Sequence, residues 1–160
     1  MTKKTRLNAL LMLPPGGIDL VSAALRHVRD ATYLGGSPAP HTSLDQAFHL
    51  AGFGPECARK ATLGRGAFNQ TLGHRFDPFG DAVVEFAIDL DPLAHRYGAT
   101  NWATRWPTLL KWDEQSRYER TGTRTQAEVD ALLSDARDAV DSTVVSLWAD
   151  GRLPEGMALW

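Results

Sequence analysis

The sequence predicts an all-α protein, built as a four-to-five-helix up-and-down bundle. Apolar residues recur at spacings of three and four in each long segment, which is the period of an amphipathic helix. Capping residues and Gly or Pro signals bound these segments, and no run of alternating β-branched residues indicates a strand. The 160 residues are 43% hydrophobic and 22% charged, which suffices for one packed core. We therefore expect a single domain.

The first predicted helix covers residues 18–34. Its apolar stripe consists of Ile18, Val21, Leu25, Val28, Ala31 and Leu34. Gly35, Gly36 and Pro38 follow the stripe directly, and these residue types end helices. The helix is therefore expected to stop at about residue 35.

The second predicted helix extends from Ser43 to about Leu63. Ser43 and Gln46 are three residues apart, which is the spacing of a capping box. Pro55 lies inside the segment, where it removes a backbone donor. We expect the helix to kink or split there.

The remaining helices are delimited by similar signals. Residues 64–73 are polar and contain glycine, so they predict a connection, and Asp77 followed by Pro78 predicts the start of a third helix that ends at about residue 90. Residues 93–120 are irregular and rich in tryptophan, which favours short turns. Thr125 and Glu128 form a second capping box and open a last helix through about residue 150. Its acidic residues are expected to face solvent: Asp130, Asp135, Asp138 and Asp141.

The domain core is expected to span about residues 18–150 of 1–160, with residues 1–17 and 151–160 as terminal extensions. Cys57 is the single cysteine, which excludes an internal disulfide and a zinc site of paired cysteines. No stretch reaches the roughly 18 apolar residues that a membrane span needs. Residues 1–17 lack a signal-peptide cleavage site. We expect a cytoplasmic protein.

Charge is distributed unevenly along the chain. Residues 1–76 carry a net charge of +5 and residues 77–160 a net charge of −7, within a total of −2. Nucleic-acid binding usually requires a basic excess over the whole domain, and this chain has none. A local basic face in the first half remains an alternative to solvated helix surfaces.

Titratable residues are placed on common faces of the first two helices. His27 and Asp30 share a face of the first helix, because they are three residues apart. His49, Glu56 and Lys60 share a face of the second helix at spacings of seven and four. If the two helices face each other, these groups converge on one pocket with His74, which precedes the third helix.

The residues of this pocket suggest acid–base chemistry. His74 or Glu56 would be the general acid or base, and Lys60 or Arg117 would hold an anionic substrate. His27 completes the candidate catalytic set, and the candidate binding residues are Asp30, Lys60, His49, Arg117, Tyr118 and Trp112. The alternative is a buried Glu56–Lys60 pair that only fixes helix register.

A metal site is the less favoured interpretation. Di-iron helical bundles carry a Glu-x-x-His motif on each of two helices, and this motif is absent from the sequence. Carboxylates on the third helix are equally explained as a solvated face. Motifs for phosphate-binding loops and serine nucleophiles are also missing. We therefore expect no metal and no cofactor.

Three segments resemble the HEPN family of small helical-bundle proteins. They are residues 25–31 (LRHVRDA), 49–61 (HLAGFGPECARKA) and 112–118 (WDEQSRY). The second is similar to a family helix with the pattern hydrophobic-Ala-Gly-aromatic-x-x-Glu-Cys-x-x-Lys-Ala. Together they cover about residues 20–148. The resemblance implies a HEPN-like fold and a cytoplasmic homodimer that acts in toxin–antitoxin or defence systems, as a ribonuclease or as the partner of a nucleotidyltransferase.

The family's ribonuclease motif is absent from this chain. It consists of an arginine followed, after four to six residues, by a histidine. No histidine here has an arginine at that distance; His74 lies roughly where the family histidine would fall, but Arg65 is too far upstream.

Three functions are expected, in this order of preference. The first is a HEPN-like module that binds a nucleotide or a protein partner. The second is a small-molecule enzyme with a His/Asp/Glu/Lys pocket between the first two helices. The third is a degenerate, metal-independent ribonuclease that cleaves RNA with His74 and a basic residue supplied from elsewhere.

Overall fold

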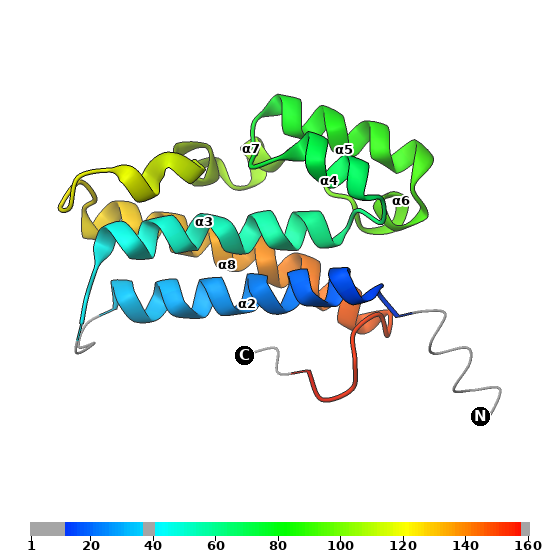
Figure 1. Cartoon of the computed structure of the whole chain (residues 1–160), viewed down its shortest axis with the longest axis horizontal. Coiled ribbons are helices and arrows are strands. Elements are labelled where there is room, and N and C mark those ends of the chain that lie inside the picture. Colours follow the sequence, from blue (N-terminus) through cyan, green and yellow to red (C-terminus); the bar gives the residue numbers. More distant parts are fainter. Residues whose placement is uncertain (1–11, 37–40, 158–160) are drawn as a thin grey trace.

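A computed structural model describes residues 12–36 and 41–157, and it confirms the all-α class: these residues form helices and connections without a strand (Figure 1). The α-helices are α2 (Pro15–Gly35), α3 (Leu44–Ala61), α4 (Gly66–Leu72), α5 (Pro78–Leu90), α6 (Pro92–Tyr97), α7 (Trp102–Arg105) and α8 (Gln126–Ala149). Two 3₁₀-helices, η1 (Pro107–Lys111) and η2 (Glu114–Tyr118), precede α8. Within the described ranges, no helix is both long and apolar enough to cross a membrane.

Three long helices form the main layer. α2, α3 and α8 pack against one another, and their buried apolar side chains make up most of the core. Figure 1 shows α2 antiparallel to α3, whereas α8 runs in the same direction as α3. The expected up-and-down connectivity is therefore not confirmed, because the long segment between α3 and α8 returns the chain to the starting end.

α2 and α3 approach closely because small residues line their contact. A Cβ atom added to Gly54 on α3 would lie 2.5 Å from Cγ2 of Val28 on α2. Ala24, Ala47 and Ala51 are fully buried in the same core. Only small side chains allow this separation, so the sequence of α3 fixes how near α2 can come.

The predicted helix starts are confirmed at three positions. The side chains of Ser43, Asp77 and Thr125 accept hydrogen bonds from the backbone of the first turn of α3, α5 and α8. Thr125 and Glu128 make both bonds of the capping box. α2 ends at Gly35 as expected, while Pro38 lies outside the described residues.

Two predictions about local structure are wrong. α3 continues through Pro55 without a split, and Figure 1 shows no sharp bend in it. Pro55 is buried between packed helices, and this packing outweighs the loss of one backbone hydrogen bond. Residues 66–72, expected as a connection, form the short helix α4, which Leu72 anchors with 1% of its surface exposed.

The segment between α3 and α8 forms a second layer over α3. α4, α5 and α6 enclose a small separate core of Leu63, Leu72, Val83, Val84, Ala87 and Ala94. Asp91 is buried and accepts hydrogen bonds from the backbone N–H groups of Arg65, Leu93 and Ala94. Its carboxylate therefore joins the start of α6 to the residue that precedes α4.

The sequence suggested that the carboxylates of α8 face solvent, but two of them form hydrogen bonds to residues at the start of η1. Asp138 accepts a hydrogen bond of 2.7 Å from Nε1 of the buried Trp106. Asp135 accepts bonds from the backbone N–H and the hydroxyl of Thr108 at 2.9 and 2.6 Å. These two residues fasten η1 to α8.

Both ends of the described chain contribute to the core. Leu13 and Leu153, which lie outside the predicted core of residues 18–150, are 3% and 5% exposed. The N–H of Leu13 donates to the carbonyl of Arg152. Residues 1–11 and 158–160, which belong to the predicted terminal extensions, lie outside the described residues.

Candidate acid–base site at His74

The candidate site is centred on the carboxylate of Glu56, which α3 holds in a buried position. The side chain of Glu56 is 8% exposed. Lys60, one turn further along α3, donates from Nζ to Oε1 at 2.7 Å. His74 places Nδ1 2.7 Å from Oε2. Both oxygens of the carboxylate are therefore engaged, one by a cation and one by an imidazole.

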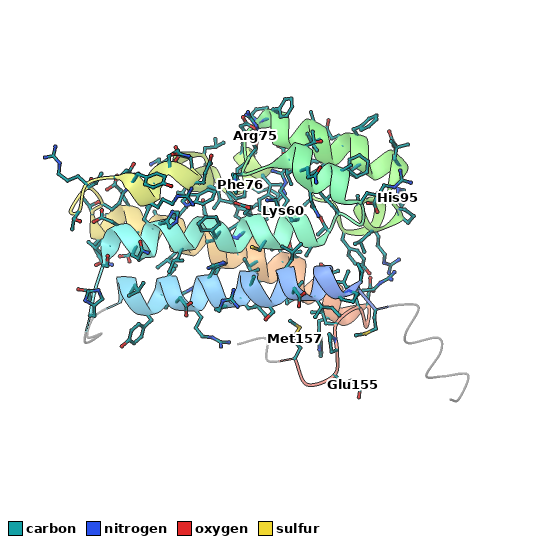
Figure 2. All side chains as sticks on the ribbon, viewed as in Figure 1. Lys60, Arg75, Phe76, His95, Glu155 and Met157 are labelled. Carbon is teal, nitrogen blue, oxygen red and sulfur yellow. The ribbon has the colours of Figure 1, made fainter. Side chains whose placement is uncertain are left out.

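His74 reaches Glu56 because the connection from α4 to α5 crosses over α3. Gly73 ends α4 with a positive φ of 56°, a conformation that favours glycine and turns the chain. The guanidinium of Arg59 on α3 then donates to the carbonyl of Arg75 at 3.0 Å. Figure 2 shows the crossing, with Lys60 on α3 and Phe76 and Arg75 above it. Two bonds to α3, one between Glu56 and the His74 ring and one between Arg59 and the carbonyl of Arg75, thus fix the position of His74.

Hydrogen bonding sets the tautomer of His74. An ionised carboxylate only accepts hydrogen bonds, and Oε1 of Glu56 already accepts one from Lys60. Neutral His74 must then carry its proton on Nδ1 and donate it to Glu56. Its Nε2 is left as an unprotonated acceptor, which is the form of a histidine that can take up a proton.

A cavity of about 310 Å³ lies beside His74. It is lined by His74, Arg75, Phe76, Asp77, Leu109, Leu110, Trp112, Asp113 and Glu114. His74 itself is 42% exposed, so the imidazole is accessible. Arg75 pairs with Asp77 at 3.0 Å, whereas Asp113 and Glu114 form no ion pair among the described residues. The cavity is polar and carries more negative than positive charge.

Phe53 gathers three histidines around its ring. The ring centroid of Phe53 lies 4.8 Å from that of His49, 5.6 Å from that of His27 and 6.4 Å from that of His74. Trp112 packs edge-on at 5.0 Å. The Phe53 ring therefore connects the Glu56–His74 pair to His27 on α2 and to His49 on α3.

Trp112 is held against α3 by a glycine and by one hydrogen bond. Its Nε1 donates to the carbonyl of His49 at 2.8 Å. A Cβ atom added to Gly52 would lie 2.1 Å from the Trp112 ring. The indole forms one wall of the cavity, so the absence of a side chain at Gly52 shapes the site.

Burial keeps two of the three histidines neutral. Desolvation lowers the pKa of His27, and Arg26 lowers it further, while Asp30 and Glu56 act in the opposite direction. Desolvation also lowers the pKa of His49, with contributions from Arg117 and His27. Nδ1 of each ring is buried without a hydrogen-bond partner. Both imidazoles are therefore uncharged at neutral pH.

Glu114 is ionised at the rim of the cavity. Hydrogen bonding of its carboxylate to its own backbone N–H is the largest cause that lowers its pKa, and His74 and Arg117 contribute smaller electrostatic effects. Cys57 lies on α3 next to Glu56, but burial raises its pKa to about 11. A thiol with that pKa is a poor nucleophile at neutral pH.

The structure brings six of the nine predicted residues together. Glu56, Lys60 and His74 are bonded directly, and His27, His49 and Trp112 surround Phe53. The other three lie elsewhere: Asp30 is exposed beside a separate hollow of α2, and Arg117 and Tyr118 are exposed on η2, where the guanidinium of Arg117 stacks over the Tyr118 ring at 4.8 Å. The bonded group lies between α3 and residues 73–77, and not between the first two helices as expected.

Sequence reasoning missed Phe53 and the acidic cavity wall. Phe53 is four residues after His49 and three before Glu56, so helical spacing already places it on their face. Asp77 was identified only as a helix cap, and nothing local relates it to residues 113–114. In the part of the chain that the structure describes, no group of three or more His, Cys, Asp or Glu residues is placed to hold a metal ion.

Comparisons with models of protein families, with curated proteins and with solved structures find no match to this chain. The resemblance to the HEPN family therefore stays a prediction.

Proposed function

We propose that the chain is an enzyme in which His74 acts as general base on a small polar substrate. The observation that carries the proposal is the arrangement of Lys60, Glu56 and His74, in which one buried carboxylate orients an accessible imidazole. A histidine oriented by a carboxylate is a recurring means of proton transfer in enzymes.

The proposed step is a proton transfer at Nε2 of His74. The imidazole removes a proton from an O–H or N–H group of the substrate, or from a water molecule that attacks it. The carboxylate of Glu56 stabilises the resulting imidazolium through Nδ1. The proton then returns to the leaving group or product from the same nitrogen. Such a group contributes about 10²–10⁴-fold to a rate.

The cavity supports a small substrate over RNA. Its volume of about 310 Å³ is at the lower limit of ordinary ligand pockets. The lining carboxylates Asp77, Asp113 and Glu114 outnumber the lining cation Arg75 and would repel a polyphosphate chain. Lys60 is engaged by Glu56 and Arg117 does not line the cavity, so neither supports the anionic substrate that the sequence suggested.

The HEPN-like module, which the sequence alone placed first, is the second proposal here. It rests on the resemblance of residues 25–31, 49–61 and 112–118 to the HEPN family. In this proposal the chain is a cytoplasmic homodimer that binds a nucleotide or a nucleotidyltransferase and acts in toxin–antitoxin or defence systems. Light scattering on the purified chain tests the dimer, and calorimetric titration with nucleotides tests the ligand. A monomer that binds neither a nucleotide nor a nucleotidyltransferase would remove this proposal and leave the enzyme.

The enzyme proposal is tested with a panel of chromogenic esters, amides, glycosides and phosphodiesters. We expect turnover of at least one class, with kcat reduced by about 10²–10⁴-fold in His74→Ala and less in Glu56→Gln. His95→Ala is the matched control, because His95 is an exposed histidine of α6 outside the site. Turnover that survives in His74→Ala would refute the role of His74.

A further inference from the structure

The outer side of α5 exposes large apolar side chains. Phe79, Phe86 and Leu90 are 55%, 63% and 44% exposed. At 100° per residue these three positions fall within one narrow sector of the helix. The ring of Phe68 on α4 packs edge-on against Phe86 at 6.2 Å and extends the apolar surface. Exposed apolar surface of this kind marks interaction sites in soluble proteins.

No described element covers this surface. α5 buries its inner side, with Val83, Val84 and Ala87, against α4 and α6. Figure 1 shows α5 at the edge of the molecule, on the side away from α2 and α3. At the N-terminal end alone, the guanidinium of Arg75 stacks over Phe79 at 5.0 Å. Phe86 and Leu90 have no such cover.

Carboxylates line one edge of the apolar stripe. Glu85 and Asp89 are exposed, one turn apart, and neither forms an ion pair among the described residues. Asp81 continues the same row but is bonded to Arg59. α4 and α5 contain no lysine or arginine. The α5 face, defined here as Phe79, Phe86, Leu90, Glu85 and Asp89, is therefore apolar with a negative edge.

We propose that the α5 face docks an amphipathic helix of a partner protein, with an apolar stripe and a row of Lys or Arg side chains at four-residue spacing. The apolar stripe of the partner would cover Phe86 and Leu90, and its cations would pair with Glu85 and Asp89. An amphipathic helix binds an apolar surface through residues at i, i+3, i+4 and i+7, and complementary charges along the edge fix its register. A second copy of this chain is a poorer fit, because an antiparallel pair of α5 helices sets carboxylates against carboxylates, and in a parallel pair α4 and α5 offer no lysine or arginine to meet them.

The test uses two synthetic helical peptides of about 18 residues, long enough to hold helical structure on binding. Both carry leucine at helical spacing, and they differ only in having lysine or glutamate along one edge. We expect the lysine peptide to bind the full chain and the glutamate peptide to fail. Phe86→Ser should weaken binding by about tenfold or more, as loss of a central anchor does. The double variant Glu85→Lys/Asp89→Lys should invert the preference.

A matched control distinguishes binding at the α5 face from non-specific hydrophobic binding. Trp148 on α8 is 58% exposed, so Trp148→Ser removes a comparable apolar side chain elsewhere and should leave binding unchanged. Failure of the lysine peptide to bind, equal binding by Phe86→Ser, or equal loss in Trp148→Ser would overturn the proposal. A wild-type dimer that Phe86→Ser converts to monomer would instead assign the face to a second copy. None of these variants touches Glu56 or His74, so the result does not depend on the enzyme proposal.

Discussion

Gly52 shows how one residue shapes the site. Its missing side chain leaves room for the Trp112 ring, which lies in the space a Cβ atom would occupy. The nearby Gly54 leaves room for the side chain of Val28 on α2 in the same way. The sequence pattern around these glycines is therefore explained by packing as well as by any family resemblance.

We expect Gly52→Ala to destabilise the fold by about 1–3 kcal/mol, because the added methyl group overpacks a buried contact and displaces the indole. Thermal unfolding should show a fall in Tm of roughly 2–4 °C for each kcal/mol. Gly16→Ala is the control, since no atom lies within 4 Å of a Cβ at Gly16. Equal Tm values for Gly52→Ala and wild type would contradict the tight packing of Trp112.

Two histidines make the stability depend on pH. The pKa values of His27 and His49 are lowered from 6.5 in the folded chain, chiefly by burial. Below about pH 6.5 the unfolded chain takes up protons that the folded chain resists, so the free energy of unfolding falls as the pH falls. We expect a lower urea midpoint at pH 5.5 than at pH 7.5, with a smaller difference in His27→Gln and His49→Gln.

The exposed His95 is the control for this prediction. His95→Gln should retain the full difference between the two pH values. A midpoint that stays constant or rises on acidification would show that the two imidazoles are not held neutral. The same variants leave Glu56, Lys60 and His74 in place, so the measurement addresses the surroundings of the site.

At the scale of elements, α3 organises the site because one face of it carries His49, Phe53, Glu56 and Lys60. Helical spacing alone predicts this face, and the Glu56–Lys60 bond confirms that part of it. His74 was expected in the same pocket, but the route by which it reaches Glu56 could not be predicted, because that route depends on Gly73 and on the bonds that Arg59 makes across the layers. Asp30 on α2 and Arg117 on η2 have suitable chemistry for the site, but both side chains are exposed, and neither lines the cavity beside His74.

Helix ends were predictable for a related reason. The caps at Ser43, Asp77 and Thr125 are local hydrogen bonds between residues three apart, so they can be read from the sequence. Pro55 and α4 were predicted wrongly because packing decided both. The buried Pro55 is held in α3 by the residues packed around it. A helix of only seven residues, such as α4, is stable only where it packs against the rest of the chain.

Asp138 attaches the start of η1 to α8 through its bond with Trp106. Asp138→Ala leaves Nε1 of the buried Trp106 without an acceptor, which should cost about 1–3 kcal/mol in the free energy of unfolding. Asp138→Asn keeps a side-chain oxygen and should cost less. Urea denaturation compares the two variants. Equal stability of Asp138→Ala and wild type would show that this carboxylate is only a solvated surface group.

At the scale of the whole molecule, Arg59 joins the two layers. The residue is 1% exposed, bonds Asp81 on α5 and the carbonyl of Arg75, and stacks over the Trp102 ring at 4.8 Å. Burial lowers its pKa to about 10, which still leaves the guanidinium charged at neutral pH. The second layer, and with it His74, is therefore positioned by one buried cation.

We expect Arg59→Met to cost about 3–5 kcal/mol, because it strands the Asp81 carboxylate. Arg59→Lys keeps the charge but loses the planar pair of donors, so it should cost less. Guanidinium unfolding curves for the two variants measure these differences. A change below about 1 kcal/mol in Arg59→Met would show that the layers are held together by apolar contacts alone.

The proposed general base requires that Glu56 orient His74 with an unprotonated Nε2, and nitrogen-15 NMR of the imidazole detects this arrangement. The spectrum identifies which nitrogen carries the proton in the neutral ring. We predict the Nδ1–H tautomer for His74 in the wild-type chain, with Nε2 unprotonated, and a changed tautomer balance in Glu56→Gln. A neutral His74 protonated on Nε2, or a spectrum unchanged in Glu56→Gln, would contradict the proposed general base.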